Sequence, residues 1–563
     1  MGEARQTGSG GEILIQSLVS QGVDHVFCVP GESYLAALDA MHDRKIVVTV
    51  CRQEGGAAMM AEAAGKSTGR PGICFVTRGP GATNASAGIH IAAQDSTPMI
   101  LFIGQVERGM REREAFQEID YKSFYGGIAK WAAEIDSVAR IPEFVSRAFH
   151  VATSGRPGPV VLSLPEDLLV EVGTVSHARP WRQIETSPGA SEMQELQELL
   201  AAAKRPVAIL GGSRWTPAAC AAVAEFAERN NIPVATSFRR QSLFSAEHSC
   251  FAGEAGAGIN PGLKALVQES DLLLVIGGRL SELPSSSYSL VDIPEPAQRF
   301  VHVYPGAEEI GRVYRPTLGI HASPTAFAGA LRDVTLPERS GDWCERARTS
   351  YLEWTEQPPA NPGKVQVAAL IKWLRQNLPD DAILTTGAGN YAGWVQRYFR
   401  FREFATFVAP TSGSMGYGVP AAVGLQRLHP TKIVVAFAGD GCFLMHGQEF
   451  ATAVQYGLPI IVVVINNGMY GTIRMHQERE YPGRVTATEL INPNFSDYAR
   501  AFGGHGETVE TTDEFAPAFQ RARSAGKPSI IEVRIDPEAI STTSTLSEIR
   551  TKALQRAVSQ RSN

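Results

Sequence analysis

Short apolar runs rich in β-branched residues alternate with amphipathic helical stretches along the chain, and this alternation constrains the fold more than any other feature. Apolar runs of this length are typical of strands that are buried on both faces of a sheet. Buried strands separated by helices form βαβ units, so the sequence predicts α/β domains built on parallel sheets. The runs that we interpret as strands are Ile46–Val50, Gly72–Val76, Met99–Ile103, Val160–Leu164, Val207–Leu210, Leu272–Ile276, Ile433–Phe437 and Ile460–Ile465.

Two polar connectors interrupt the alternation. One runs from about residue 173 to 190, and the other from about residue 337 to 363. Cutting the chain there leaves blocks of ordinary domain size, so the predicted fold class is α/β with three doubly wound parallel-sheet domains. The predicted parts are an N-terminal domain, a central domain, a C-terminal domain and a tail, at residues 10–172, 191–336, 364–537 and 538–563.

The tail has the pattern of a capped helix. Ser and Thr residues precede a stretch in which Leu546, Ile549 and Leu554 recur at helical spacing. Such a helix either covers a site or packs on the surface, and we expect the second.

Composition and charge exclude several classes of partner. The net charge is −6 and no long basic run is present, so we expect neither nucleic acid nor an anionic membrane as a partner. The longest apolar run, Leu458–Ile465, is too short to span a bilayer. The 7 cysteines form no CxxC pair, which is typical of a reducing compartment. The polar N-terminal stretch lacks the apolar core of a secretory signal, so we expect a cytoplasmic protein.

The most specific chemical signal lies in the third block. The strand Ile433–Phe437 runs into Ala-Gly-Asp-Gly at residues 438–441, and Asn466-Asn467-Gly468 ends the next strand, with a helix at Gln448–Tyr456 between them. Glycines at 439 and 441 allow backbone amides to approach phosphate oxygens. Side chains at the carboxyl ends of neighbouring parallel strands meet at one rim of the sheet. Carboxylate, amide and carbonyl oxygens there, together with phosphate oxygens, form the oxygen set that Mg²⁺ prefers.

This stretch, from GDGCFLMHGQEF to VINNGMYG, resembles the thiamine-diphosphate motif of the acetohydroxyacid synthase and decarboxylase superfamily. The resemblance implies that Asp440, Asn467 and the carbonyl of Met469 hold Mg²⁺, which in turn holds the diphosphate of the cofactor. It also implies that Asn390 and Tyr391, in TTGAGNYAGW, contact the diphosphate, although the residue types there differ from those of the family.

The segment RQEGGAA in the first block resembles the RHEQGAA segment of the same family. Taken alone, Glu54 would be a first-turn carboxylate that is favoured by the helix dipole. The resemblance instead implies that Glu54 hydrogen-bonds N1′ of the aminopyrimidine and so activates the cofactor. In TSGSMGYGVPAA it implies that Met415 bends the cofactor and that the Gly413 carbonyl accepts a hydrogen bond from the 4′-amino group.

The similarity to acetolactate synthases spans about residues 10–540, and it weakens at the substrate pocket. The resemblance places Gln117, in the segment AFQE, above the reacting carbon as a neutral hydrogen-bond donor. Three positions depart from the family: Leu283 replaces the arginine that clamps the second keto acid, His476 replaces a tryptophan, and Glu166 replaces a lysine. His476 is either an exposed rim residue or a proton shuttle. The lost arginine puts the identity of the second substrate in doubt.

The central block has a Rossmann-like pattern, with glycine-rich segments after two of its strands. In acetohydroxyacid synthases this block binds a non-redox FAD, whereas related decarboxylases carry it empty. Both alternatives are open here, since neither segment is a GxGxxG. The residues that match the flavin-binding pattern are Arg156, Gly211, Gly212, Gly277 and Arg279.

The sequence therefore predicts a thiamine-diphosphate- and Mg²⁺-dependent enzyme that decarboxylates a pyruvate-like 2-oxo acid and ligates the activated acyl unit, as acetolactate synthases do. The alternatives are a non-ligating decarboxylase or lyase acting on a bulkier acyl substrate, and a catalytically silent homologue. The resemblance also implies a homo-oligomer with its active sites at the subunit interface.

Overall fold

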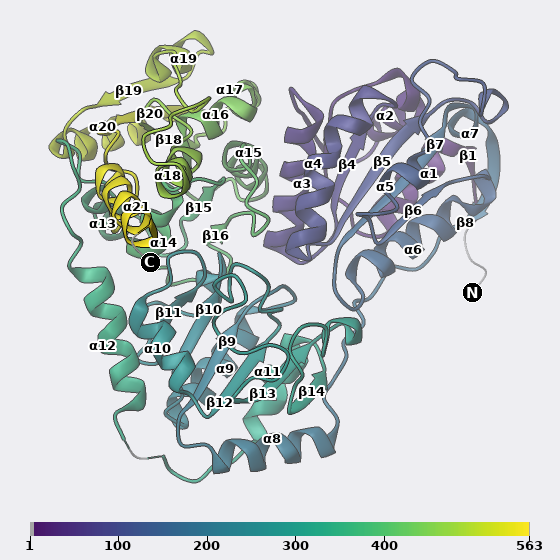
Figure 1. The fold of residues 1–563 in the computed structure, drawn as a ribbon. Helices are drawn as coiled ribbons and strands as arrows, with labels where there is room; N and C mark the ends of the chain where they lie inside the picture. Colours follow the sequence, from purple (N-terminus) through teal and green to yellow (C-terminus); the bar gives the residue numbers. More distant parts are fainter. Residues whose placement is uncertain (1–4, 340, 562–563) are drawn as a thin grey trace. The chain divides into compact units, whose positions relative to one another are not determined.

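The computed structural model describes residues 5–339 and 341–561 (Figure 1). These residues form two compact units, one made of the chain up to residue 186 together with 423–428, and the other of the remaining residues. Three six-stranded parallel sheets, one for each predicted domain, confirm the predicted fold class.

The six-stranded sheet of the N-terminal domain has the strand order β3-β2-β4-β5-β7-β6, and all strand pairs within this sheet are parallel. Its strands are β2 (His25–Cys28), β3 (Val47–Val50), β4 (Gly72–Val76), β5 (Met99–Gln105), β6 (Trp131–Glu134) and β7 (Pro159–Pro165). Its helices are α1 (Gly10–Ser20), α2 (Leu35–His42), α3 (Glu54–Thr68), α4 (Pro80–Asp95), α5 (Tyr121–Tyr125), α6 (Ile141–Thr153) and α7 (Glu166–Val170). In Figure 1, α3 and α4 lie side by side against the sheet.

The central domain has the strand order β11-β10-β9-β12-β13-β14, again with parallel pairs throughout. Numbered within the domain this is the order 3-2-1-4-5-6 of dinucleotide-binding folds, as the glycine pattern predicts. The strands are β9 (Pro206–Leu210), β10 (Val234–Ser237), β11 (Phe251–Ala255), β12 (Leu272–Ile276), β13 (Arg299–Tyr304) and β14 (Leu318–His321). The helices are α8 (Ala190–Ala202), α9 (Pro217–Arg229), α10 (Pro261–Glu269), α11 (Pro324–Ala330) and α12 (Trp343–Glu356).

The C-terminal domain has the strand order β16-β15-β17-β18-β20-β19, which is the order of the N-terminal domain when both are numbered along the chain. Its strands are β15 (Ile383–Thr386), β16 (Phe407–Val408), β17 (Val434–Gly439), β18 (Ile461–Asn466), β19 (His505–Val509) and β20 (Ser529–Arg534). Its helices, including those of the tail, are α13 (Val367–Asn377), α14 (Ala392–Tyr398), α15 (Gly418–Leu428), α16 (Asp440–His446), α17 (Phe450–Gln455), α18 (Gly471–Glu480), α19 (Phe495–Ala501), α20 (Thr512–Ser524) and α21 (Leu546–Arg561).

Each sheet has one place where the connections of two neighbouring strands lead away in opposite directions. These pairs are β2 with β4, β9 with β12, and β15 with β17. At such a switch point the loops at the carboxyl ends of the strands diverge and leave a crevice in which α/β proteins bind ligands.

The second predicted connector is wrong in part, because it contains α12. Trp343, Ala347 and Tyr351 are buried, and their spacing places them on one face of the helix. Tyr351 packs edge-on against Phe251 of β11, with the ring centroids 4.9 Å apart. The many charged residues between the apolar ones conceal this face in the sequence.

Two further local structures differ from the sequence prediction. The predicted helix Gln448–Tyr456 corresponds to α17 and the 3-10 turn before it, but the chain forms another helix, α16, directly after β17, which the sequence analysis did not predict. A Cβ atom at Gly447 would lie 2.6 Å from the Phe443 ring, so glycine lets the chain between α16 and α17 pack closely against this ring. The polar segments Arg5–Ser9 and Val172–Ser176 form an antiparallel pair, β1 and β8, which the sequence analysis missed.

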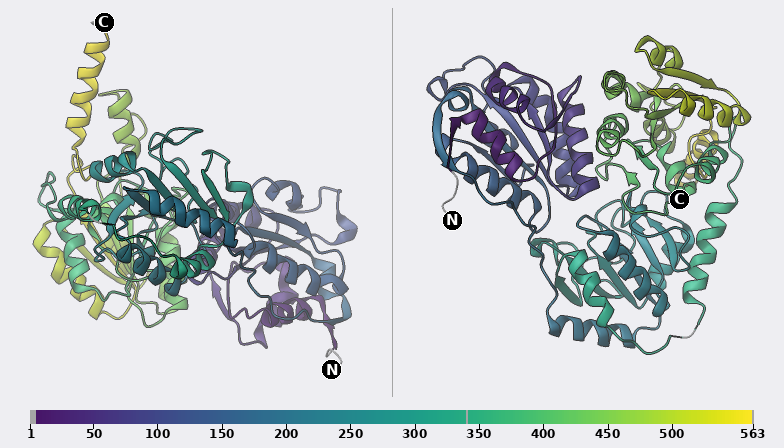
Figure 2. Two further views of the ribbon diagram at one scale, coloured as in Figure 1. Left: turned by 90° about the horizontal axis from the view of Figure 1, so that it is seen from below. Right: turned by 180° about the vertical axis from the view of Figure 1, so that it is seen from behind.

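The tail forms the predicted helix, α21, which packs on α18 and projects from the rest of its domain (Figure 2). Leu546 is buried and Leu554 is half exposed, while Ala553 occupies the buried face instead. The helix therefore packs against the surface of the domain, as the sequence predicts, but it does so on the helix that follows the metal motif.

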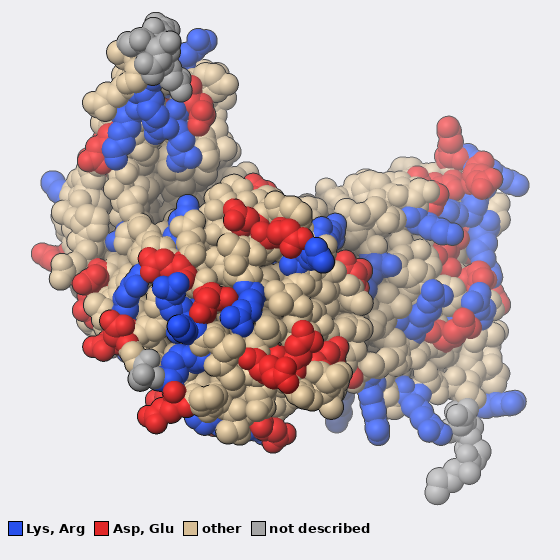
Figure 3. Space-filling model, turned by 60° about the horizontal axis from the view of Figure 1, so that its bottom comes forward, with Lys and Arg blue, Asp and Glu red and all other residues tan. Residues whose placement is uncertain are grey.

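None of the described helices is long and apolar enough to cross a bilayer. On the face drawn in Figure 3, basic and acidic side chains are interspersed over the domains.

Candidate functional site

A cavity of about 230 Å³ lies at the switch point of the C-terminal sheet, where β15 and β17 end. The structure brings most of the predicted C-terminal site residues together here. Those that line the cavity are Asn390, Tyr391, Gly413, Met415, Gly439, Asp440, Gly441, Asn467 and Met469. Residues that the sequence analysis missed also line it, among them Trp394, Cys442, Tyr470, Thr472, Ile473 and Ile540.

Asp440 is the first residue of α16, and its side chain is buried. Burial raises the pKa of its carboxyl above the ordinary value. The hydrogen bonds that oppose this rise come from the side chain of Asn492 and from the backbone amides of Gly441, Gly468 and Met469. The end of β17 and the turn after β18 therefore meet at this carboxylate, as the strand spacing predicts.

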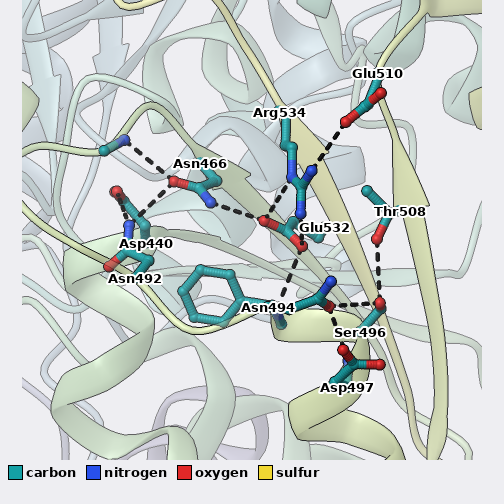
Figure 4. Close-up of polar contacts among 12 residues, drawn as sticks. Asp440, Asn466, Asn492, Asn494, Ser496, Asp497, Thr508, Glu510, Glu532 and Arg534 are labelled. Carbon is teal, nitrogen blue, oxygen red and sulfur yellow. Dashed lines mark hydrogen bonds and ion pairs between the residues drawn. The ribbon is translucent and has the colours of Figure 1, made fainter.

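Asn492 is a site residue that the sequence analysis missed. Its Nδ2 donates to Asp440 Oδ2 at 2.7 Å and to Asn466 Oδ1 at 3.1 Å (Figure 4). Asn466 in turn donates to Glu532 of β20. Thus Asn466 is part of the supporting network, whereas Asn467 lines the cavity. No motif marks Asn492 in the sequence, because its position depends on how the loop before α19 folds back.

The Asp440 site suits a divalent cation. No lysine or arginine of the described residues forms an ion pair with Asp440, and these residues contain no cluster of three or more His, Cys, Asp and Glu side chains that could hold a metal. A single buried carboxylate next to the Asn467 amide and the Met469 backbone favours Mg²⁺ with phosphate oxygens as its remaining ligands.

The two glycines of the GDG motif are required by aromatic rings. A Cβ atom at Gly441 would lie 2.6 Å from the Tyr470 ring, and one at Gly439 would lie 3.0 Å from the Tyr391 ring. Larger side chains would push these rings out of the cavity wall. The glycines therefore allow close packing in addition to exposing backbone amides.

The polar side-chain atoms of Asn390 and Tyr391 form hydrogen bonds within the protein. Asn390 Nδ2 donates to the Ile540 carbonyl at 3.0 Å, and its Oδ1 accepts from Thr472 Oγ1 at 3.0 Å. The Tyr391 hydroxyl accepts from the Gly387 amide and lies 3.3 Å from Cys442 Sγ. Both residues line the cavity, and they hold together the loops that surround it.

Gly413 and Met415 lie in the turn before α15. Gly413 has a φ of +70°, which favours glycine, and its amide donates to the Pro410 carbonyl at 3.2 Å. Met415 is partly buried against the core of the domain and lines the cavity. Its predicted role as a wedge is compatible with this position, and packing in the core accounts for part of its burial.

His476 does not line the cavity. It is exposed on α18, and its Nδ1 lies 3.5 Å from a guanidinium nitrogen of Arg479. The structure thus places it as the exposed histidine of the first interpretation, and its role as a proton shuttle stays a prediction.

Glu54 is the first residue of α3, preceded by Gln53, whose side chain caps the helix through the Gly56 amide at 3.1 Å. Asn84 Nδ2 of α4 donates to Glu54 Oε2 at 2.9 Å. A Cβ atom at Gly81 would lie 3.3 Å from Glu54 Oε1, so glycine leaves room for the carboxylate. Helix α4 therefore fixes the orientation of this carboxylate.

Gln117 has a left-handed backbone with a φ of +64°, and its side chain makes no hydrogen bond within the described residues. The segment before it is held by Arg78, whose Nε donates to the Phe116 carbonyl at 3.2 Å. Arg78 also pairs with Glu32 at 2.8 Å and with Glu166 at 3.2 Å. The acid that replaces the lysine of the family thus helps to hold the Gln117 loop.

The central domain brings its glycine-rich segments together at the switch point. The Gly211 amide donates to the Ile276 carbonyl, and a Cβ atom at Gly212 would lie 1.8 Å from the Gly277 carbonyl oxygen. Packing between the two loops therefore already requires glycine at 212. Arg279 and Leu283 are both partly exposed in the loop that follows β12.

Arg156 lies in the N-terminal domain, where it contacts the end of α4. Its Nε donates to Ser96 Oγ at 3.0 Å, and its Nη2 donates to the Ala93 carbonyl at 2.8 Å. These bonds give Arg156 a structural role that is independent of a flavin.

A buried carboxylate joins the tail to the cavity wall. Glu478 of α18 is fully buried, accepts from Arg550 of α21 at 2.7 and 2.8 Å and from the Gly483 amide, and forms an ion pair with Arg474. The bonds from Arg550 contribute most to lowering the pKa of Glu478 to about 2.

We expect Glu478→Gln to release α21. Two guanidinium groups would lose their shared anion, at a cost of about 3 kcal/mol, so protease cleavage of the tail should become roughly 100-fold faster near neutral pH. Because the folded pKa is depressed, the ion pair stabilises the protein above about pH 4.5 and is lost as the pH falls towards about 2. The difference from wild type should shrink over that range. Glu480→Gln, on the exposed side of α18, is the control. Equal cleavage rates in the two variants would contradict the role of the Glu478–Arg550 contact in holding α21.

Three parallel α/β domains, two of them with one strand order, and a buried Asp–Asn site at a switch point define a thiamine-diphosphate-dependent enzyme. Family models for thiamine pyrophosphate enzymes agree with this class. The N-terminal TPP binding domain matches residues 8–124, the central domain residues 193–331, and the C-terminal TPP binding domain residues 387–533.

Curated relatives narrow the class. The chain is 29% identical over 536 residues to the acetolactate synthase isozyme 2 large subunit of Escherichia coli (strain K12), covering 94% of this chain and 96% of that protein. It is 31% identical over 547 residues to the acetolactate synthase large subunit of Lactococcus lactis subsp. lactis, covering 94% and 92%. It is 30% identical over 552 residues to the acetolactate synthase large subunit of Corynebacterium glutamicum, and the match covers 94% of this chain and 87% of that protein. The chain belongs to the acetolactate-synthase family of thiamine pyrophosphate enzymes.

Proposed function

We propose that this protein uses thiamine diphosphate and Mg²⁺ to decarboxylate a pyruvate-like 2-oxo acid and to ligate the resulting acyl unit to an acceptor. The observation that carries the proposal is the cavity at the β15–β17 switch point, where Asp440, Asn467 and Met469 converge. The family membership supports the same chemistry.

The residues of the chain have the following roles in this proposal. Asp440, Asn467 and the Met469 carbonyl hold Mg²⁺, and the amides at the start of α16 face the diphosphate. Met415 and the Gly413 carbonyl hold the aminopyrimidine, and Glu54 holds a proton at N1′. When bound, thiamine diphosphate supplies the electron sink for decarboxylation.

The same geometry also supports a second candidate, a decarboxylase or lyase that does not ligate two keto acids. Acetolactate formation requires the second keto acid to be held by its carboxylate, and Leu283 stands where the family has the clamping arginine. Arg279 is the nearest arginine in sequence. The identity of the acceptor therefore separates the two candidates.

Leu283→Arg is expected to raise acetolactate output relative to simple decarboxylation. A charge-assisted hydrogen bond to the carboxylate contributes about 1.5–3 kcal/mol, or roughly 10- to 100-fold in product partitioning. The measurement is CO₂ release and product analysis from pyruvate, with and without an aldehyde acceptor. Leu283→Met keeps the site apolar and serves as the control. A wild-type protein that already converts nearly all pyruvate into acetolactate would contradict the lost-clamp argument and support the plain synthase.

For FAD, the strand order of the central domain supports binding at the carboxyl ends of β9 and β12, next to Gly211 and Gly277. An empty central domain is the alternative, since loop packing accounts for the glycine at 212. The absorbance spectrum of the purified protein distinguishes the two alternatives, because a bound flavin absorbs visible light and an empty domain does not.

We further propose a homo-oligomer, in which the N-terminal domain of one subunit completes the cofactor site of another. The family resemblance supports this arrangement, and the molecular mass in solution tests it.

A further inference from the structure

A side chain of the central domain bonds the turn that carries two residues of the cavity wall, Gly413 and Met415. Arg239 lies in the loop after β10 and is 3% exposed, and its Nη1 donates to the Pro410 carbonyl at 2.6 Å. The same carbonyl accepts from the Gly413 amide at 3.2 Å. Pro410 begins the turn that carries Gly413 and Met415, so one arginine of the central domain anchors this turn.

A second contact comes from the neighbouring strand. Glu254 of β11 accepts from the Arg239 backbone amide at 2.6 Å. Gln396 Nε2 of α14 donates to both Glu254 carboxylate oxygens, at 3.1 and 3.2 Å. The first turn of α14 contributes Trp394 to the cavity wall, three residues after Tyr391. Glu254 therefore holds the helix that forms another side of the cavity.

The Arg239 guanidinium is buried behind the cavity wall rather than lining it. It lies 4.9 Å from the centroid of the Phe238 ring. Burial raises the pKa of both Tyr391 and Cys442, and the charge of Arg239 partly offsets this rise, so the cation acts on two residues of the cavity wall. A buried cation is costly without fixed partners, so its bonds define one arrangement of the surrounding loops.

We propose that Arg239 and Glu254 are positioning residues for the cofactor: Arg239 fixes the turn that presents the Gly413 carbonyl and Met415, and Glu254 fixes α14 through Gln396. The proposal rests on the proposed function in taking thiamine diphosphate as the occupant of the cavity. It gives the central domain a role in cofactor binding that does not depend on a flavin.

The test combines two measurements: amide hydrogen exchange of the cofactor-free protein and calorimetric affinity for thiamine diphosphate. In Arg239→Met, amide hydrogen exchange of the cofactor-free protein should become faster at residues 410–417, because the turn loses its anchor. Calorimetry in the presence of Mg²⁺ should show about 10- to 100-fold weaker binding of thiamine diphosphate, as when a supporting shell is removed. Arg239→Lys should recover part of the affinity, since it restores the charge but not the planar donor group.

Two further variants separate positioning from general destabilisation. Arg339→Met removes a guanidinium that bonds the carbonyls of Asn230, Leu200 and Ala203 inside the central domain, so exchange should rise there while the cofactor affinity stays unchanged. Gln396→Leu breaks the Glu254 contact from the C-terminal side and leaves Arg239 in place. It should speed exchange at residues 392–398 and weaken cofactor binding, and it also serves if Arg239→Met fails to fold.

Wild-type affinity together with wild-type exchange at 410–417 in Arg239→Met would overturn the proposal, as would equal losses of affinity in Arg239→Met and Arg339→Met. A wild-type protein that binds no thiamine diphosphate would instead contradict the proposed function. The exchange measurements would still decide whether Arg239 and Gln396 hold the two loops.

Discussion

Replacing Glu54 by glutamine is expected to slow exchange of the C2 proton of bound thiamine diphosphate by about 10²- to 10⁴-fold, with little effect on the fold. Glutamine has the same shape and still accepts the hydrogen bond from Asn84. It cannot hold a proton at N1′ as a carboxylate does. The loss of one negative charge in the first turn of α3 costs only about 0.3–1 kcal/mol of stability.

The measurement is proton exchange at C2 by NMR after rapid acid quenching, with circular dichroism as the check on the fold. Glu143→Gln is the matched control, because Glu143 is also an acid in the first turn of a helix, α6, of the same domain. Exchange at the wild-type rate in Glu54→Gln would remove Glu54 from the activation step.

Asp440→Ala is expected to abolish Mg²⁺-dependent retention of thiamine diphosphate. Truncating one member of a buried charged contact costs about 2–5 kcal/mol, which corresponds to roughly 30-fold to several-thousand-fold in affinity. Asn467→Ala should give a loss of the same kind, because it removes a neutral oxygen ligand. Asn492→Ala should weaken binding by about 10- to 100-fold, because Asn492 only orients the Asp440 carboxylate.

Calorimetry with thiamine diphosphate at several Mg²⁺ concentrations measures this series. Asp497→Ala, which removes an exposed acid of the same domain, is the control. Unchanged affinity in both Asp440→Ala and Asn467→Ala would contradict the metal site. A larger loss in Asn492→Ala than in Asp440→Ala would mean that Asn492, and not the carboxylate that it contacts in Figure 4, holds the cofactor.

Much of the fold and of the C-terminal site follows from local sequence. The run Ile433–Phe437 is apolar at every position, so it is buried on both faces wherever it pairs, and it forms most of β17. Asp440 and Asn467 follow two successive strands of one sheet, and strand spacing alone brings their backbones to one rim. Gly439 and Gly441 are recognisable because glycine at a strand–helix turn lets backbone amides approach a phosphate, whereas their close approach to the Tyr391 and Tyr470 rings appears only in the structure.

Features that depend on contacts between distant segments were decided by the tertiary structure. Helix α12 looks like a polar connector until Tyr351 is seen against Phe251. Strands β1 and β8 are polar segments that only pairing turns into a sheet. No local pattern marks Asn492, because its role depends on a hydrogen bond to Asp440, which lies 52 positions away in the sequence.

The contact of Arg239 with Pro410 was likewise decided by the tertiary structure. Its segment shows no motif, and its role follows from a hydrogen bond to Pro410, 171 positions away in the chain. The periodicity of apolar residues predicts which face of a helix or strand is buried, and the spacing of motifs predicts which residues lie at the end of a strand. Which polar atoms satisfy one another after burial is a property of the packed chain, because each such bond is selected by the desolvation cost of leaving its partner unpaired.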